Sequence, residues 1–391
     1  MRTPRALGAL LVTTLVSGLL AGATAAPPGA VAAEEPAARA TPELQVTTIA
    51  SGLDHPWDVG QLPDGRLLVT ERERARVSLV DGSDVTPVDF PSDTVWVSGE
   101  TGLMGLAVDP RFEKNRRFYT CQGATRSGGS NDVRVMAWKL KRGAGGTKVA
   151  RRGVLLKGIP ATTGRHGGCR LLVQDNGALV VGTGDAAQGT NPRDLTSLGG
   201  KTLRLDRFSG KPWKRNPFSQ ASNRTKRYVL TYGHRNVQGV AQRKGGALWS
   251  VEHGPDVDDE VNRLKKGGDY GWHPVPGYNE RVPMTDFSLP GKQYGARWSS
   301  GDPTLATSGG NFVYGRQWGA YRGSLVVGAL RSQRVLFMKF DKRDRLKTVR
   351  VPEELQAYGR VRQAYQLADG DLVLLTDNGG GEDQVLRVSP S

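Results

Sequence analysis

The feature that most restricts the fold of this chain is a hairpin pattern that occurs six times between residues 55 and 380. The unit has an apolar strand, a tight turn such as Asp-Gly, Asn-Gly or Gly-Gly, and a second strand rich in Leu and Val, and the second copy is a looser version of it. Asp-Gly and Asn-Gly between β-rich runs predict hairpins because both residues tolerate the positive φ that a type I′ turn requires. The six copies lie at residues 55–72, 102–123, 166–185, 234–255, 308–331 and 360–380.

The spacing of these hairpins, about 45 to 75 residues, predicts the architecture. No stretch of useful length has helical periodicity, so the class is all-β. Repeats of this length indicate a six-bladed β-propeller of four-stranded antiparallel sheets, in which each blade buries its faces against its neighbours. The 52 glycines fit a fold with many tight turns.

The N-terminal segment has the composition of an export signal. Two arginines precede an apolar run at residues 6–21, and small residues follow at 23–25. We therefore assign residues 1–25 to a secretory signal peptide, 26–42 to a disordered Ala/Pro linker, and 43–391 to the propeller. The apolar run is too short to cross a bilayer and no later run approaches that length, so we expect no transmembrane segment. The expected location is secreted, either extracellular or associated with the cell wall.

The formal charge is +16, with 54 Lys and Arg against 38 Asp and Glu. These cations are dispersed, without a basic amphipathic helix or an alternation of aromatic and basic residues, so we expect no nucleic-acid binding. Most of the charge is interpreted as solvated surface. A positive field nevertheless favours an anionic ligand.

The chain has two cysteines, Cys121 and Cys169. In an exported protein one disulfide is the simplest interpretation, and two unpaired buried thiols are the alternative. Cys121 follows the second hairpin and Cys169 begins the third, so adjacent blades would bring them together. No further Cys or His has the spacing of a metal ligand.

Hairpin geometry also predicts which polar residues lie at the same end of the propeller. Residues before the first strand and after the second lie at the same end of a hairpin, so these positions from all six copies should meet at one mouth of the propeller. They are rich in His, Arg and carboxylates, whereas the turn ends carry mainly Pro, Asp, Gly and Lys. A rigid scaffold that gathers such side chains around one opening predicts a ligand site there.

The segments around this mouth resemble a known family. They are HPWDVGQLPDGRLLVTER, GLMGLAVDPRF, HGGCRL followed by GTGD, YGHRNVQG, WSVEHGP with DDEVN, GDYGW, and GRVRQ followed by LADGDLVLLTDN. In this order, over residues 46–388, they are similar to the soluble quinoprotein aldose (glucose/sorbosone) dehydrogenases. The resemblance implies an oxidoreductase that uses pyrroloquinoline quinone (PQQ) and Ca²⁺ to oxidise the anomeric carbon of an aldose by hydride transfer to the quinone.

The resemblance also implies roles for individual residues. His166 matches the catalytic base and Asp185 the carboxylate that orients it, and a neutral imidazole held in this way suits proton abstraction. Arg235 matches a position beside the quinone carbonyl, where a positive charge stabilises developing negative charge. Arginine also pairs well with the three carboxylates of PQQ. The implied cofactor-binding residues are Arg235, Asn236, Gln238, Arg331, Arg360, Arg362 and Glu100.

For Ca²⁺ the resemblance implies the backbone carbonyls of Gly254 and Pro255, which are suitable hard ligands. The nearby acidic run at residues 256–260 lacks an EF-hand register and is interpreted as a solvated turn. Tyr270, Trp272 and Trp298 are candidates for stacking on the sugar or quinone, with core packing as an equal alternative.

This chain departs from the best-known glucose dehydrogenases at three positions. Arg165 replaces an Asp that contacts the sugar, Arg331 replaces a Lys, and Glu100 replaces a Gln. The sugar and the external electron acceptor are therefore left open. The alternatives are a calcium-dependent propeller lactonase or esterase and a non-catalytic propeller that binds glycan or protein.

Overall fold

The structure, a computed structural model, describes residues 40–143 and 145–391. The predicted signal peptide and residues 26–39 of the predicted linker lie outside this part of the chain. Residues 40–42 contact the fifth blade, where the Ala320 amide donates to the Ala40 carbonyl (2.9 Å). Among the described residues, no helix has the length and apolar character needed to cross a membrane.

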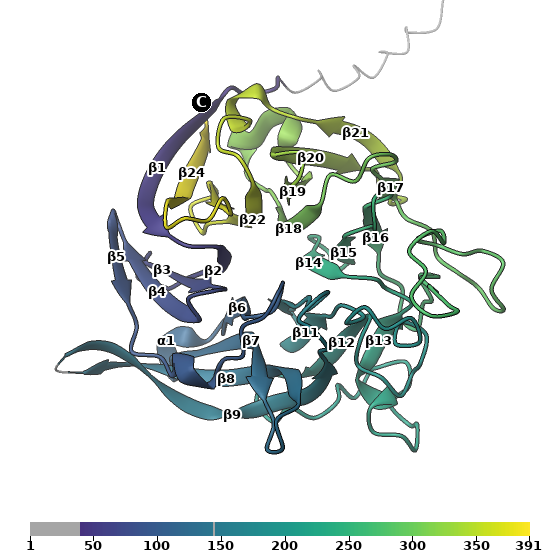
Figure 1. The fold of residues 1–391 in the computed structure, drawn as a ribbon. Coiled ribbons are helices and arrows are strands. Elements are labelled where there is room, and N and C mark those ends of the chain that lie inside the picture. The colour runs from purple at the N-terminus through teal and green to yellow at the C-terminus, as the bar shows by residue number, and fades with distance from the viewer. Residues whose placement is uncertain (1–39, 144) are drawn as a thin grey trace, which may run out of the picture. The chain divides into compact units, whose positions relative to one another are not determined.

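Six four-stranded antiparallel sheets surround a central axis, which confirms the predicted six-bladed propeller (Figure 1). Blade 1 contains β2 (Pro56–Gln61), β3 (Leu67–Glu71), β4 (Arg76–Asp81) and β5 (Asp84–Pro87). Blade 2 contains β6 (Leu103–Val108), β7 (Arg117–Thr125), β8 (Asn131–Gly143) and β9 (Gly146–Pro160). Blade 3 contains β10 (Arg170–Val173), β11 (Ala178–Gly182), β12 (Lys201–Asp206) and β13 (Val229–Tyr232).

The remaining blades follow the same order. Blade 4 contains β14 (Val237–Gln242), β15 (Leu248–Glu252), β16 (Glu260–Arg263) and β17 (Trp298–Ser299). Blade 5 contains β18 (Thr307–Phe312), β19 (Leu325–Ala329), β20 (Arg334–Phe340) and β21 (Leu346–Arg350). Blade 6 contains β22 (Val361–Gln366), β23 (Leu372–Thr376), β24 (Asp383–Pro390) and β1 (Leu44–Leu53). The short helices are α1 (Phe112–Asn115), η1 (Ser92–Thr94), η2 (Lys226–Tyr228), η3 (Arg316–Tyr321) and η4 (Glu353–Leu355).

The ring is closed by the N-terminal strand. β1 forms the outer edge of the sixth blade and pairs antiparallel with β24, with Leu44 opposite Pro390 and Leu53 opposite Asp383. The first and last strands of the propeller are therefore held in one sheet. This pairing fixes the sixth blade against the first.

The six predicted hairpins are the two inner strands of the six blades. The second strand explains their Leu and Val content, because β3, β11, β15, β19 and β23 are buried at every position. Such strands pack against a neighbouring blade on both faces, so they need apolar side chains on both. Outer strands such as β21 are mostly exposed.

The hairpin turns differ from the expected type I′ geometry. In the first, the Gly65 amide donates to the Leu62 carbonyl (3.0 Å), and only Gly65 has a positive φ (+90°), whereas Asp64 does not. The turn between β10 and β11 repeats this arrangement with Gly177 (φ +86°). Glycine therefore occupies the last position of a three-residue loop, in the manner of a turn followed by a glycine bulge.

A disulfide joins the second and third blades. Cys121 on β7 and Cys169, just before β10, have their Cα atoms 6.0 Å apart and their sulfurs bonded. Both are buried in the apolar core shared by these blades, which includes Val133 and Leu171. The predicted disulfide is confirmed.

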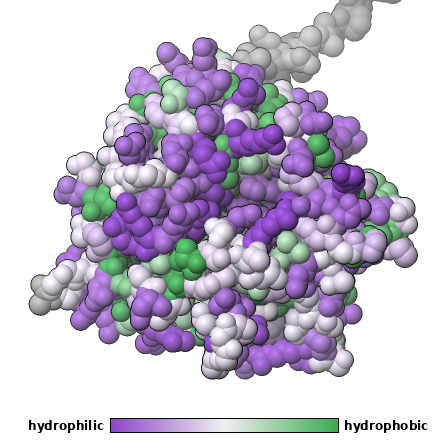
Figure 2. All heavy atoms as spheres, in the orientation of Figure 1, coloured by the Kyte–Doolittle hydropathy of each residue, from purple (hydrophilic) through white to green (hydrophobic). Residues whose placement is uncertain are grey.

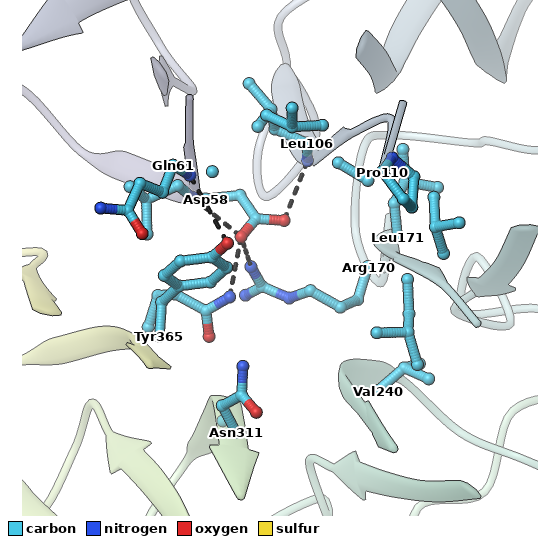
Figure 3. A pocket seen from close by; sticks show the side chains of 17 residues that line it. Asp58, Gln61, Leu106, Pro110, Arg170, Leu171, Val240, Asn311 and Tyr365 are labelled. Carbon is cyan, nitrogen blue, oxygen red and sulfur yellow. Dashed lines mark hydrogen bonds and ion pairs between the residues drawn. The ribbon is translucent and has the colours of Figure 1, made fainter. Parts of the chain in front are cut away.

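The propeller axis is closed at mid-height by charged and polar side chains rather than apolar ones. Arg170 is buried, forms an ion pair with Asp58 (2.8 Å), and donates to the Gln238 carbonyl (2.9 Å). Beyond this pair is a cavity of about 310 Å³ lined by residues of all six innermost strands. In Figure 3, Asn311 and Tyr365 lie around this cavity with Asp58 and Arg170.

Candidate functional site

The predicted meeting of hairpin ends at one mouth is visible in the hydrogen bonds between blades. Glu100, which precedes β6, accepts from the backbone amide of His166 (3.2 Å) and from the side chain of Asn236 (3.1 Å). One carboxylate thus joins the leading positions of blades 2, 3 and 4. In Figure 2 the centre of the ring is hollowed and bordered by hydrophilic residues.

His166 and Asp185 form a buried pair at this mouth. Their side chains are 3% and 0% exposed, and His166 Nδ1 lies 2.8 Å from Asp185 Oδ1. The carboxylate can only accept here, so Nδ1 carries the proton. His166 Nε2 forms no hydrogen bond within the described residues and is left as an acceptor.

Three further donors hold the Asp185 carboxylate. Oδ1 accepts from the Ala187 amide (2.8 Å), while Oδ2 accepts from Trp272 Nε1 (2.8 Å) and the Tyr278 hydroxyl (2.8 Å). The Tyr278 oxygen also lies 3.0 Å from His166 Nδ1. Burial and the charge of Asp185 raise the pKa of Tyr278, so its hydroxyl stays protonated and donates. The carboxylate is fixed in position and so fixes the imidazole.

Arg235 lies on the loop before β14, beside this pair. Its guanidinium forms an ion pair with Glu280, donates to the His253 carbonyl (3.1 Å) and lies 5.7 Å from the Trp272 ring centroid. Glu280 also pairs with Arg165 (2.6 Å). The loop that carries Tyr278 and Glu280 is therefore attached to both the His166 and the Arg235 sides of the mouth.

Arg360 and Arg362 meet at Asp377, although only Arg362 belongs to β22 (Val361–Gln366) and Arg360 precedes it. Arg362 is buried, donates to Asp377 Oδ2 (2.5 Å) and reaches Gln238 Oε1 (3.1 Å). Arg360 donates to the Asp377 carbonyl (2.8 Å) and keeps 41% of its side chain exposed. Burial alone would raise the pKa of Asp377, but the charge of Arg362 and the hydrogen bond from His55 hold it below its ordinary value.

A cavity of about 200 Å³ opens between these groups. Its wall contains four residues predicted from the sequence and five that were not. The lining residues are Trp57, Arg72, Glu100, Gln238, His253, Ala306, Leu330, Arg360 and Arg362.

The cavity wall is cationic and has buried polar atoms without a partner. Among the described residues, Nε of Arg72 and Nε2 of His253 on this wall, and Nε of Arg235 outside it, have no hydrogen-bond partner. Burial and the charges of Arg362 and Arg235 keep the pKa of His253 well below its ordinary value, so this imidazole is neutral. The guanidinium carbons of Arg170 and Arg362 lie 3.9 and 5.9 Å from the centroid of the Trp57 ring. An aromatic surface surrounded by guanidinium groups fits a flat polyanion.

Gly254 and Pro255 follow His253 directly at this cavity. Within the described residues their carbonyl oxygens accept no hydrogen bond, so both remain available as ligands. Asp259 holds the loop by accepting from the Gly254 amide (2.9 Å) and the Thr304 hydroxyl (2.7 Å). No group of three or more His, Cys, Asp or Glu with metal-binding geometry occurs in the described part of the chain. Backbone oxygens are therefore the available donors for a hard cation.

Arg331 is the one predicted residue that the structure does not connect to this network. Its side chain is exposed and forms no hydrogen bond or ion pair with the described residues, although its neighbour Leu330 lines the cavity. Of the aromatic candidates, Trp272 contacts Asp185. Tyr270 is a core residue stacked on His234 (4.6 Å), and Trp298 packs in the core of blades 4 and 5.

The sequence analysis did not assign Arg72, Trp57, His253, Tyr278 or Glu280 to the site. The first three occupy leading or trailing positions of hairpins, so the repeat pattern contained a signal for them. Tyr278 and Glu280 come from the long excursion between β16 and β17, which has no counterpart in the repeat. Nothing in the sequence indicated that this loop reaches the mouth.

Comparison with known proteins agrees with this geometry. A family model described as Glucose / Sorbosone dehydrogenase matches residues 53–387. The aldose sugar dehydrogenase YliI of Escherichia coli is 29% identical, over 89% of this chain and 93% of its own length.

Two solved structures superpose over nearly the whole propeller. The apo form of the soluble aldose sugar dehydrogenase from E. coli has a TM-score of 0.78 at 28% identity, covering 89% of this chain and 100% of that one. The PQQ-bound aldose sugar dehydrogenase from Streptomyces coelicolor has a TM-score of 0.73 at 27% identity, covering 90% and 100%.

Proposed function

The chain belongs to the Glucose / Sorbosone dehydrogenase family, and from this premise we propose that it oxidises the anomeric carbon of an aldose with PQQ as cofactor. The observation that carries the proposal is the buried His166–Asp185 pair, with Nε2 free, beside a small cavity lined by guanidinium groups. A base next to an anion-binding pocket is what removal of a hydroxyl proton and hydride transfer to a bound quinone would require.

The residues of the mouth have separate roles in this reaction. His166 takes the hydroxyl proton at Nε2, and Asp185 holds the imidazole in the tautomer with Nδ1 protonated. Arg235 places a fixed positive charge next to His166, where negative charge develops in the transition state. PQQ, when bound, would supply the acceptor for the hydride, which carries both electrons of the oxidation.

The fit to a tricarboxylate rests on the cations of the cavity. Arg360 and Arg362 present guanidinium groups from β22 and the residue before it, while Arg72 and Arg235 each keep an unpartnered Nε–H group. Gln238 accepts from Arg362 (3.1 Å), and Asn236 donates to Glu100 (3.1 Å), so these polar residues join neighbouring blades at the cavity. We also assign Arg331 to this cavity because it follows Leu330, which lines it, and carries an uncompensated charge.

We propose that Ca²⁺ binds the carbonyl oxygens of Gly254 and Pro255. These oxygens have no hydrogen-bond partner among the described residues and lie next to a cavity that would hold an anionic ligand for the same ion. A cation at this point would offset part of the charge of the cofactor.

We further propose that the protein is exported and acts outside the cytoplasm. The disulfide supports this, because such bonds persist in oxidising compartments. A lactonase or esterase would gather carboxylates and Asn around a metal. In the described part of this axis the carboxylates of Asp58 and Asp377 instead form ion pairs with Arg170 (2.8 Å) and Arg362 (2.5 Å), which supports an anion-binding site over a metal-activated water.

The test is reconstitution. PQQ and Ca²⁺ are added to purified protein, cofactor binding is followed by absorbance, and turnover is followed with an artificial electron acceptor across a panel of aldoses. His166→Ala should bind PQQ as the wild type does and lose turnover. Arg360→Ala with Arg362→Ala should lose PQQ binding.

The control removes two guanidinium groups elsewhere. Arg151→Ala with Arg152→Ala changes exposed residues of β9 and should alter neither binding nor turnover. If the wild type takes up no PQQ, the dehydrogenase proposal is wrong. Uptake without turnover on any aldose would favour a binding propeller, and the reverse pattern in the two site variants would show that their roles are misassigned.

A further inference from the structure

Lys201 is a buried lysine to which the reaction above gives no role. It is the first residue of β12 and is 0% exposed. Among the described residues its Nζ pairs with no carboxylate and instead donates to three backbone carbonyls, those of Asn191 (2.5 Å), Pro192 (3.0 Å) and Gly199 (2.7 Å). Three acceptors require three N–H groups, so this arrangement binds the ammonium form.

The charge of Lys201 is compensated by neutral dipoles rather than by a direct ion pair. Burial lowers the pKa of Lys201 from 10.5 to about 7, while nearby carboxylates such as Asp194 and Asp185 oppose this change. A side chain needed only to fill this space could be apolar, since burying a charge costs free energy. Carbonyl oxygens replace the hydration shell of a monovalent cation in the same manner. Lys201 is therefore equivalent to a cation built into the chain.

The loop that surrounds this ammonium begins at Asp185. Residues 186–200 connect Asp185 to Lys201, between β11 and β12. Asn191, whose carbonyl binds Lys201, also donates from its side chain to the Asp185 carbonyl (2.8 Å). The Ala187 amide donates to Asp185 Oδ1 (2.8 Å). The position of the Asp185 carboxylate therefore depends on the shape of this loop.

The start of the loop has a backbone conformation that other contacts must hold. Ala186 and Ala187 have φ angles of +56° and +52°, in the left-handed region that residues other than glycine rarely occupy. Two successive alanines remain there only where the surrounding structure fixes them. If the rest of the loop were released, both residues would relax and the Ala187 amide would move away from Asp185.

The same loop supports the opposite side of the mouth. A Cβ atom on Gly189 would lie 2.4 Å from the carbonyl oxygen of Gly277, the residue before Tyr278, so the two loops are in direct contact. The amide of Gly233, on the segment that leads to β14, donates to the Pro192 carbonyl (2.8 Å). The loop around the ammonium thus contacts each segment that orients the catalytic pair.

We propose that Lys201 is a positioning residue for the oxidation. Its ammonium takes the place of a bound cation and holds residues 186–200 in the shape that places Asp185 and, through it, the His166 imidazole. The inference rests on the proposed function of the mouth, and it gives Lys201 no contact with the sugar or the quinone. Loss of the ammonium should therefore lower kcat more than the affinity for sugar or PQQ.

The test replaces the side chain in two ways. Lys201→Ala removes three methylene groups and the ammonium, which together have the shape of propylammonium, whereas Lys201→Met fills the same space without a charge. Both variants are assayed at about pH 6, where the ammonium of the wild type predominates, with propylammonium chloride, with 1-propanol as its neutral isostere, and with neither. Lys211→Ala, which changes an exposed lysine after β12, is the matched control.

One measurement does not need turnover. In protein with ¹⁵N-labelled histidine, the Nδ1–H proton of His166 reports its hydrogen bond to Asp185 directly. The chain has five histidines, so this resonance is identified by its absence in His166→Ala. If the wild type oxidises no aldose, the proposed function is wrong, and the resonance still tests the role of Lys201. PQQ affinity and thermal melting are measured separately.

We expect Lys201→Ala to lose about 100-fold in kcat, with KM and PQQ affinity within about threefold of the wild type, and to lose or shift the His166 resonance. Propylammonium should restore both in Lys201→Ala, saturably, and neither in Lys201→Met. An unchanged kcat and resonance in Lys201→Ala would overturn the proposal. Equal recovery with 1-propanol would also overturn it, since the charge would then be unnecessary.

Asn191→Ala provides a second test if Lys201→Ala does not fold even with propylammonium. This variant keeps the carbonyl that Lys201 binds and removes the side-chain amide that donates to the Asp185 carbonyl. We expect kcat to fall and the His166 resonance to shift, as in Lys201→Ala. A wild-type kcat with an unchanged resonance would show that the loop does not position Asp185, and the proposal would be wrong.

Discussion

The hydrogen bond from the Tyr278 hydroxyl to Asp185 should contribute to the rate of the proposed reaction. Replacing Tyr278 by Phe removes one of four donors from a carboxylate that is 0% exposed, so water cannot take its place. A hydrogen bond to a charged group contributes about 1.5–3 kcal/mol. Because three donors remain, we expect the lower end of this range, a loss of about tenfold in kcat/KM.

The effect should fall on turnover and not on cofactor binding. The aromatic ring and the Glu280 ion pairs are retained in Tyr278→Phe, so PQQ affinity should stay within about threefold of the wild type, and kcat should fall with kcat/KM.

The assay is steady-state turnover of the reconstituted enzyme between pH 5 and 9, with PQQ affinity measured separately. Tyr294→Phe is the matched control, because the Tyr294 hydroxyl forms no hydrogen bond in the described structure and its ring lies beside Tyr270. The reasoning is refuted if Tyr278→Phe keeps the wild-type rate. A loss of PQQ binding that accounts for the whole decrease would also refute it.

Two further predictions concern stability. Replacing Cys121 and Cys169 together by Ser should lower the free energy of unfolding by about 4 kcal/mol, because the disulfide closes a loop with a sequence separation of 48 and so restricts the unfolded chain. Urea denaturation measures this change, and a decrease below about 1 kcal/mol would contradict the prediction. Burial and the neighbouring charge of Glu252 raise the pKa of Glu260 from 4.5 to about 8. The folded state therefore keeps a proton that the unfolded state loses, so stability should fall as the pH rises from about 5 to 8, and Glu260→Gln should flatten this dependence. An unchanged slope in Glu260→Gln would show that other groups cause it.

The sequence predicted the fold because its main signals are local. Each hairpin has two apolar runs, most copies have a glycine in the turn between them, and six copies of one unit are compatible with few architectures. The disulfide followed from the same placement, since Cys121 and Cys169 flank adjacent units. The turn type was wrong because the Asp-Gly dipeptide is compatible with two turn geometries, and only the pairing of the flanking strands selects between them.

Other features depended on contacts distant in sequence. Closure of the ring joins Leu44 to Pro390, and no local pattern in β1 indicates that it belongs to the last blade. Tyr278 reaches Asp185 across 93 residues, and Arg235 pairs with Glu280 across 45. Tyr278 and Glu280 lie in a loop outside the repeat, so neither the repeat pattern nor a motif could predict their positions.

The sequence by itself thus determined the blades, their number, and the end at which His166, Asp185 and the arginines gather, because strand direction and side-chain alternation are properties of each hairpin. Only the tertiary structure decided which groups touch, such as the four donors on the Asp185 carboxylate and the Arg170–Asp58 ion pair at the axis. The physical reason is that hydrogen bonds and ion pairs depend on distances of a few ångströms between segments far apart in the chain, and those distances exist only after the six sheets have packed against one another.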